Sequence, residues 1–227
     1  SMCAYMFGDP GDKIYLPDLY WGNYGLLFAN AYGMEISTYN TFKDGGYDVE
    51  AMREALLAGP IGKRIVLLNF PNNPTGYTVT PAEADRIREV LIEVAEAGNQ
   101  VVAWIDDAYF GLVYEDGILT ESAFGRLANA HERILAVKVD GATKEDYVWG
   151  FRVGFITYAI KGGTTALYKA LEAKTAGAIR GNISNAPAIS QSLMKKAYLS
   201  DEYAGQKKEK YNPLKARVDK VKKILAA

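Results

Sequence analysis

The chain has 227 residues, of which 49% are hydrophobic and 23% are charged, and this composition is typical of a globular protein rather than a disordered or fibrous one. Its 26 Lys and Arg residues nearly balance its 27 Asp and Glu residues, so charge predicts no nucleic-acid partner. The single histidine, His131, excludes a multi-histidine metal site, and we predict no bound metal.

The compartment is predicted from apolar runs and cysteine usage. No run approaches the roughly eighteen consecutive apolar residues that a membrane helix needs, so we expect no membrane partner. Cys3 is the single cysteine and cannot form an internal disulfide, which favours a reducing compartment. The expected location is therefore cytoplasmic.

Apolar runs rich in β-branched residues alternate with longer amphipathic stretches along the chain. After a last helical turn at Cys3–Phe7, strands are expected at Lys13–Pro17, Glu35–Tyr39, Arg64–Phe70, Gln100–Asp106, Arg133–Val139 and Arg152–Ala159. Helices are expected at Gly22–Tyr32, Val49–Ala58, Pro81–Ala97, Glu121–His131 and Thr164–Ala176. This order predicts an α/β fold in which a mostly parallel sheet is sandwiched between helices, in three layers α/β/α.

The best helix signal lies at Thr80-Pro81-Ala82-Glu83. Thr80 can cap the helix, Pro81 suits its first position, and Glu83 completes a capping box. We therefore expect the helix to begin at Pro81.

The last third of the chain changes character and reads almost only as helix from Ala186 onward. Pro213 is expected to mark the start of the final helix, because proline suits a first turn and not a helix interior. An apolar face is predicted at helical spacing by Tyr211, Leu214, Val218, Val221 and Leu225.

A loop of strong turn formers, Asn-Phe-Pro-Asn-Asn-Pro-Thr-Gly, occupies residues 69–76 directly after an apolar strand. Open α/β sheets bind ligands at the carboxyl ends of their strands. Taken alone, the loop could equally be a polar connection with capping asparagines.

Two further strand ends carry reactive residue types. Asp106 ends an apolar strand and Tyr109 follows three residues on, so that a carboxylate could meet a cationic ring nitrogen and a phenol could donate to a ring oxygen. Lys144 follows the next strand among small residues, where an amine that loses solvation can act as a nucleophile. Arg152, eight positions later, could grip a phosphate. Each of these could also be structural: a helix cap, a core tyrosine or an ordinary surface lysine.

Together these segments resemble the large domain of the fold-type I, pyridoxal-phosphate-dependent aminotransferases of class I/II. The resemblance covers nearly the whole chain and rests on order and spacing: Asn-Pro-Thr-Gly at 73–76, Asp-x-x-Tyr at 106–109, and Lys144 with Arg152 eight residues later.

The resemblance implies a role for each matched residue. Lys144 would bond covalently to pyridoxal 5′-phosphate and shuttle the substrate proton. The residues implied to bind the cofactor are Trp21 on the ring face, Asn73 and Tyr109 at the phenolic oxygen, Asp106 at the ring nitrogen, and Thr143 and Arg152 at the phosphate. Asp107 is the alternative to Asp106 at the ring nitrogen. Gly141 stands where the family often has a phosphate-binding serine.

The implied function is transfer of an amino group between an amino acid and a 2-oxo acid, in a homodimer. The resemblance implies that residues 1–200 are the cofactor-binding large domain lacking its N-terminal part, and that residues 201–227 are a helix leading toward a missing small C-terminal domain. The family's upstream phosphate loop, its N-terminal arm and its small domain find no match, so this chain by itself is expected to be inactive. Two alternatives remain open: a β-elimination lyase that uses the same lysine, and an aminotransferase-like ligand-sensing regulatory domain.

Overall fold

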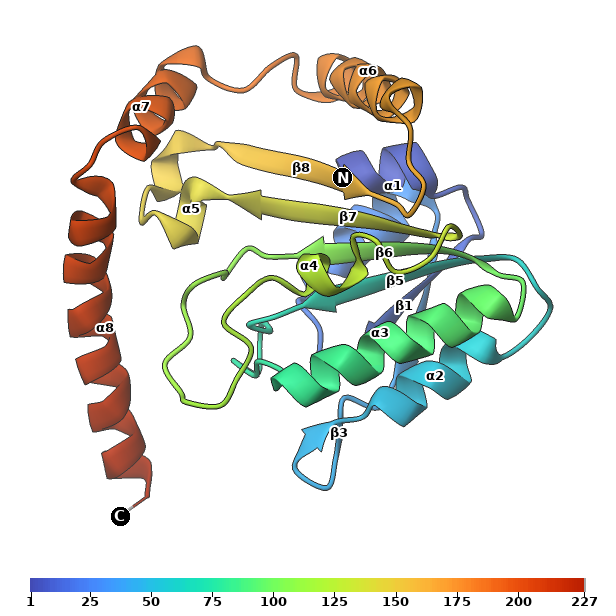
Figure 1. Ribbon diagram of the computed structural model, residues 1–227, viewed down its shortest axis with the longest axis horizontal. Helices are drawn as coiled ribbons and strands as arrows, with labels where there is room; N and C mark the ends of the chain where they lie inside the picture. Colours follow the sequence, from blue (N-terminus) through green and yellow to red (C-terminus); the bar gives the residue numbers. More distant parts are fainter. Residues whose placement is uncertain (227) are drawn as a thin grey trace.

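The computed structural model describes residues 1–226, in which strands and helices alternate (Figure 1). The strands are β1 (Lys13–Pro17), β2 (Glu35–Tyr39), β3 (Phe42–Lys43), β4 (Gly46–Tyr47), β5 (Lys63–Asn69), β6 (Gln100–Asp106), β7 (Ile134–Gly141) and β8 (Gly154–Ala159). The helices are α1 (Met2–Phe7), the π-helix η1 (Gly25–Asn30), α2 (Val49–Leu57), α3 (Pro81–Glu96), α4 (Ala123–Leu127), α5 (Ala142–Glu145), the 3-10 helix η2 (Trp149–Phe151), α6 (Thr165–Asn182), α7 (Ala188–Tyr198) and α8 (Tyr203–Leu225).

Six strands form one sheet in the order β2-β1-β5-β6-β7-β8. Every neighbouring pair from β2 to β7 is parallel, and only β8 runs antiparallel to β7. The short strands β3 and β4 form a separate antiparallel hairpin. The mostly parallel sheet predicted from the sequence is confirmed.

Strand β5 shows why the sheet needs a helix layer on each face. Val66 and Leu68 point to one face and Ile65 and Leu67 to the other, because side chains alternate along a strand, and all four are buried. Val66 and Leu68 belong to the cluster packed by α2, α3 and α4, whereas Ile65 and Leu67 belong to the cluster packed by α1 and η1. The three-layer arrangement is confirmed (Figure 1).

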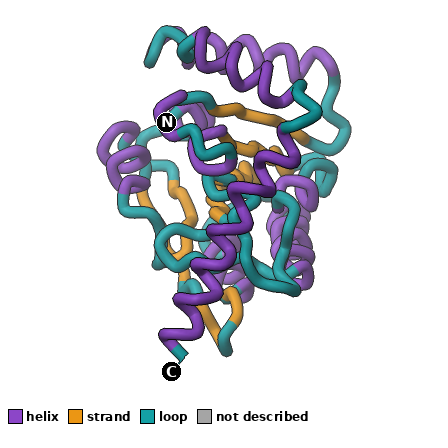
Figure 2. Tube along the Cα trace, turned by 90° about the vertical axis from the view of Figure 1, so that its left-hand side faces the viewer, coloured by secondary structure: helices purple, strands orange, loops and turns teal. Residues whose placement is uncertain are grey.

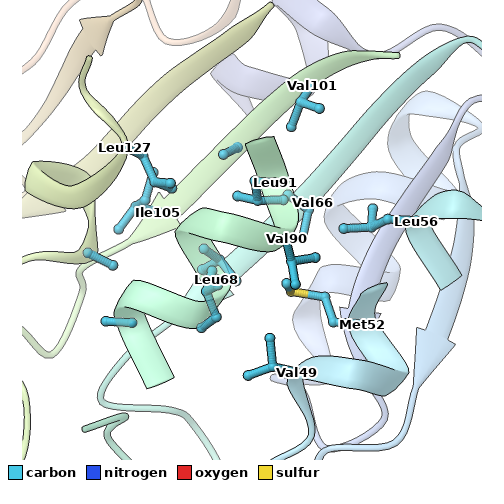
Figure 3. Packing of buried hydrophobic residues seen from close by; sticks show 14 of the residues in the cluster. Val49, Met52, Leu56, Val66, Leu68, Val90, Leu91, Val101, Ile105 and Leu127 are labelled. Atoms are coloured by element: carbon cyan, nitrogen blue, oxygen red, sulfur yellow. The ribbon is translucent and has the colours of Figure 1, made fainter. Parts of the chain in front are cut away.

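Figure 3 shows the first of these clusters from close by. Val90 and Leu91 of α3 and Met52 of α2 lie against Val66 and Leu68 of β5, and all five are fully buried. Close-packed apolar burial of this kind is the main source of the fold's stability.

Helix α3 begins as predicted. The Thr80 hydroxyl accepts a hydrogen bond from the Glu83 N–H at 3.2 Å, and the Glu83 carboxylate accepts one from the Thr80 N–H at 2.7 Å. The capping box is therefore complete, with Pro81 at the first helical position.

Several predicted elements have different bounds in the structure, and two of these differences have a clear structural reason. Arg152 is not in a strand: its φ of 52° is left-handed, which ends η2 and cannot continue an extended backbone, so β8 begins at Gly154. The helix predicted over Glu121–His131 is reduced to α4, because the chain turns toward β7 directly after Leu127.

Pro213 does not start the final helix, which was a wrong prediction. Helix α8 begins at Tyr203 and Pro213 lies inside it. Proline has no amide N–H, so the helix tolerates one missing hydrogen bond there. The predicted helix extended to the end of the chain, and Ala227 lies outside the described residues.

Helix α8 lies at the periphery, at the left edge of Figure 1 and in front of the sheet in Figure 2. None of its residues from Tyr203 to Leu225 is buried. The predicted apolar face is therefore only partly covered, and Val221 and Leu225 are exposed. Within residues 1–226, no helix combines the length and the apolar character needed to cross a bilayer.

Candidate functional site

The candidate residues gather where β5, β6 and β7 end. Asn69 and Asp106 end neighbouring parallel strands and are register partners, and Asp106 pairs in turn with Val139 of β7. The loop after β5 and the connection after β7 therefore start at the same edge of the sheet. This is the edge at which open α/β sheets bind ligands.

Two adjoining clefts lie at this edge and share Asp106, Ala108 and Lys144. The larger has a volume of about 230 Å³, and its lining includes Asp106, Thr143, Lys144 and Arg152. The smaller is lined by Trp21, Tyr24, Asn69, Asn73, Asp106, Ala108, Tyr109 and Lys144. All seven residues singled out from the sequence thus line the two clefts.

Lys144 lies in the tight connection between the antiparallel strands β7 and β8, where α5 holds it. Its ammonium nitrogen is 4.7 Å from the centre of the Tyr109 ring, close enough for a cation–π contact. The Asn73 amide nitrogen lies 3.5 Å from the Tyr109 hydroxyl oxygen. An amine, a phenol and an amide therefore meet at one side of the clefts.

The Asn73 side of the clefts is held by Asn69 at the end of β5. The Asn69 side-chain oxygen accepts a hydrogen bond from the Asn73 N–H at 2.9 Å, and its amide group donates to the Asp106 carbonyl at 2.9 Å. This one buried side chain joins the loop to the neighbouring strand end.

Asp106 and its neighbour Asp107 point to opposite faces of the sheet. The Asp106 carboxylate lines both clefts, and its two oxygens accept hydrogen bonds from the Ala108 N–H at 3.0 Å and from the Tyr24 hydroxyl at 2.6 Å. Asp107 is 1% exposed, and its carboxylate lies 3.8 Å from the Lys138 ammonium. The strand register thus places Asp106 in the clefts, and Asp107 lines neither.

Burial controls the protonation of Asp107. It raises the pKa of this carboxyl to about 7, although the Ser122 hydroxyl and the Lys138 ammonium both favour the charged form. Asp107 is therefore a buried carboxyl that lines neither cleft.

Arg152 and Thr143 line the larger cleft, whereas Asn73 lines the smaller one. The left-handed backbone of Arg152 turns the chain between η2 and β8, and its guanidinium lies 3.4 Å from the Trp149 carbonyl oxygen. The cleft thus holds a guanidinium, a hydroxyl and an ammonium, a donor set suited to an anion.

Tyr24 was not found from the sequence, although it lines the smaller cleft and contacts Asp106. Its burial, reinforced by the charge and the hydrogen bond of Asp106, raises the pKa of the Tyr24 hydroxyl far above its usual range. One signal could have identified it: Tyr24 lies at the start of the helix predicted over Gly22–Tyr32, three positions after Trp21, and a spacing of three brings side chains to one side of a helical turn.

Larger cavities lie elsewhere in the described part of the chain. One of about 370 Å³ lies between the η2 region and helices α7 and α8, and a groove of about 670 Å³ lies between α8 and the loop residues 112–118. None of the seven candidate cofactor-site residues lines either cavity, so the chemistry of the lining residues, and not the size of the cavity, identifies the candidate site. Within residues 1–226, no three His, Cys, Asp or Glu side chains gather as metal ligands would.

The sequence matches the family described as "Aminotransferase class I and II" over residues 1–227. A tyrosine aminotransferase of Klebsiella pneumoniae is 29% identical over 69% of this chain and 38% of its own length. A mitochondrial aspartate aminotransferase of Schizosaccharomyces pombe is 25% identical over 87% of this chain and 44% of its own length. The chain thus spans less than half the length of these relatives.

Solved structures share the fold. An aminotransferase from Anaerococcus prevotii superposes with a TM-score of 0.83 at 24% identity, over 95% of this chain and 53% of that one. A mitochondrial aspartate aminotransferase from Trypanosoma brucei gives a TM-score of 0.81 at 23% identity, over 99% and 57%. An aromatic-amino-acid aminotransferase from Burkholderia pseudomallei, described as covalently bound to pyridoxal phosphate, gives 0.73 at 22% identity, over 96% and 52%.

The family match extends over the whole chain, and the sheet order places the matched motifs at one edge. The chain belongs to the class I and II aminotransferase family.

Proposed function

We propose that this chain binds pyridoxal 5′-phosphate and takes part in transferring an amino group between an amino acid and a 2-oxo acid. The observation that carries the proposal is the convergence of Lys144, Asp106 and the Asn73–Tyr109 pair on clefts that they share. These groups come from three different strand ends, and the sequence motifs of the family fall on the same residues.

The side chains present fit the cofactor group by group. The Asp106 carboxylate suits a cationic ring nitrogen, and the Asn73 amide and Tyr109 hydroxyl suit the ring oxygen. Arg152 and Thr143 suit the phosphate at the other end of the larger cleft. Trp21 lines the smaller cleft and would stack on the ring.

The family's serine next to the phosphate is replaced by Gly141, and the structure supplies a reason. Gly141 of β7 pairs with Gly154 of β8, and a β-carbon at position 141 would lie 2.7 Å from the Val153 carbonyl oxygen. No side chain fits there without movement of the backbone, so Thr143 and Arg152 would hold the phosphate without a serine at this position.

The cofactor, when bound, supplies an electron sink for the substrate carbanion. Lys144 would hold it covalently through Nζ, and the same nitrogen would carry the proton taken from the substrate α-carbon. Asp106 would hold a proton on the ring nitrogen through charge-assisted hydrogen bonding. Asn73 and Tyr109 would fix the ring orientation from the opposite edge.

Other features of the whole protein are part of the same proposal. Its substrates are an amino acid and a 2-oxo acid, its assembly is a homodimer, and its location is cytoplasmic. Residues 1–200 serve as the cofactor-binding large domain and residues 201–227 as the helix toward a small domain. The names of the relatives, which are aspartate and tyrosine aminotransferases, support amino transfer over β-elimination or ligand sensing.

Borohydride reduction in the presence of pyridoxal phosphate tests the proposal. We expect mass spectrometry to find a pyridoxyl group on Lys144, and to find none there in Lys144→Ala. Lys161→Ala is the matched control, because Lys161 is an exposed lysine away from the clefts. Unselective labelling of surface lysines with Lys144 left unmodified would overturn the cofactor site.

The reaction itself is tested by product analysis. Amino transfer consumes the 2-oxo acid and forms a new amino acid, whereas β-elimination releases ammonia and a 2-oxo acid. Release of ammonia without a requirement for a 2-oxo acid would decide for the lyase.

A further inference from the structure

We propose that Tyr24 is a positioning residue that fixes the Asp106 carboxylate toward the clefts. The inference rests on the proposed function, since it assigns to Tyr24 the task of holding the carboxylate that would meet the cofactor ring nitrogen.

The two hydrogen bonds of Asp106 define how its carboxylate is turned. Oδ1 accepts from the Ala108 N–H at 3.0 Å and Oδ2 accepts from the Tyr24 hydroxyl at 2.6 Å. One donor belongs to the backbone just after β6, and the other is the side chain of the N-cap residue of η1, which lines the smaller cleft. A carboxylate held at both oxygens cannot rotate freely, so its remaining lone pairs keep their direction.

The Tyr24 ring is itself immobilised. It stacks on Phe28 with ring centres 5.4 Å apart and on Tyr20 with centres 6.4 Å apart. Only 3% of Tyr24 is exposed, and its bond to Asp106 is the one that its hydroxyl makes among residues 1–226. Within residues 1–226, the hydroxyl therefore has no second protein acceptor to turn toward.

The charge state of the pair suits this task. Burial, then the neighbouring charge of Asp106 and the hydrogen bond to it, raises the pKa of the Tyr24 hydroxyl, so the phenol stays protonated. A phenol that keeps its proton remains a hydrogen-bond donor to Asp106. A hydrogen bond between a neutral donor and a carboxylate is among the stronger ones in proteins.

Tyr24 also contacts Trp21, the residue proposed to stack on the ring. Their rings meet edge to face with centres 5.5 Å apart. The turn at residues 21–24, in which the Tyr24 N–H donates to the Trp21 carbonyl oxygen at 2.9 Å, thus presents a ring-stacking group and supports the carboxylate at the ring nitrogen. The ring face and the ring nitrogen would be held by one rigid segment.

Tyr24→Phe is the test, with Tyr20→Phe as its matched control. Tyr20→Phe removes a hydroxyl from the neighbouring stacked ring, for which residues 1–226 show no bond to Asp106. We expect Tyr24→Phe to weaken pyridoxal phosphate binding by about tenfold or more, as loss of a charge-assisted hydrogen bond does. We also expect it to reduce the circular dichroism that the bound cofactor acquires, because that signal reports the ring's orientation. Tyr20→Phe leaves both unchanged.

A double-mutant cycle with Asp106→Asn separates positioning from mere packing. If Tyr24 acts through the carboxylate, the loss caused by Tyr24→Phe shrinks markedly in the Asp106→Asn background. An equal loss in both backgrounds, or equal binding by Tyr24→Phe and Tyr20→Phe, overturns the inference while leaving the proposed function intact. Failure of the unmodified chain to form the Lys144 adduct overturns the proposed function instead, and with it this inference.

Discussion

Gly141 packs directly against Val153 across the β7–β8 pair. A β-carbon at position 141 would stand 2.7 Å from the Val153 carbonyl oxygen and 3.1 Å from the Gly154 Cα. The φ of Gly141 is 177°, extended backbone that any residue adopts, so it is the close approach of β8 that selects glycine. The connection that carries Lys144 is therefore drawn together by two facing glycines.

Restoring the family's serine at this position should harm the protein. We expect Gly141→Ser to lower the free energy of unfolding by about 1–3 kcal/mol, as overpacking does, and to lower cofactor affinity by displacing Lys144. Urea denaturation and cofactor titration measure the two effects. Gly150→Ser is the control, because a β-carbon there meets nothing within 4 Å. Tighter cofactor binding by Gly141→Ser would contradict this prediction, because it would mean that β7 and β8 move apart to accept the serine side chain without loss of the site.

Asp107 predicts a pH dependence of stability. Burial raises its pKa from 3.8 to about 7, so between these values the folded state binds more protons than the unfolded state. The contribution of Asp107 to the free energy of unfolding is fully present below about pH 4 and is lost as the pH rises through 7. Urea denaturation at pH 5 and pH 8 should show that Asp107→Asn flattens this fall. Asp116→Asn, in an exposed loop, should leave the fall unchanged, and an unaltered slope in Asp107→Asn would contradict the prediction.

Replacing Arg64, near the start of β5, should lower the stability of the fold. Its buried guanidinium donates to the carbonyl oxygens of Leu56 at 2.7 Å, Ala58 at 3.1 Å and Pro60 at 2.7 Å, which closes the turn after α2. Arg64→Met leaves these carbonyls without their donor and should cost about 3 kcal/mol or more by urea denaturation. Arg133→Met, at an exposed arginine, should cost little. If Arg64→Met lowered the free energy of unfolding as little as Arg133→Met, water would have replaced the guanidinium as the donor to these carbonyls.

Tyr211 should protect the backbone amides of the loop after Tyr109 from hydrogen exchange. The Tyr211 hydroxyl donates to the Val113 carbonyl oxygen at 2.6 Å, and its ring stacks on Tyr114 with centres 5.4 Å apart. Tyr211→Ala should speed amide hydrogen exchange in residues 112–118 without changing exchange in β5 or β6. Lys208→Ala, an exposed site on the same helix, serves as the control. Unchanged exchange in the loop would show that α8 does not hold it.

The sheet could be predicted from the sequence because its strands are short apolar runs with clear ends. The bounds of β1, β2 and β6 agree with the prediction, and the capping box fixes the start of α3. The direction of β8 could not be predicted, because a β-branched run carries no information about parallel or antiparallel pairing. Its first residue was misplaced because the left-handed backbone of Arg152 depends on the tertiary turn around it.

The sequence predicted those site residues that directly follow a strand in a recognisable motif. It missed a site residue whose contact depends on tertiary packing. Lys144, Asp106 and Asn73 stand in recognisable motifs, and the structure brings them to shared clefts. Tyr24 has no motif, and its partner lies 82 residues away in the chain. The interior proline of α8 was misread because a single missing hydrogen bond is a local cost that a long helix absorbs.

The parallel pairings also determine when the clefts can exist during folding. Each of the pairs β1–β5, β5–β6 and β6–β7 joins strands that are separated by a crossover connection. Contacts of such sequence separation form late, since loop closure precedes them. We therefore expect the donors around Lys144 to come together only when the whole sheet has acquired its register. Recovery of cofactor binding after dilution from denaturant should then time the last step of refolding rather than the first collapse.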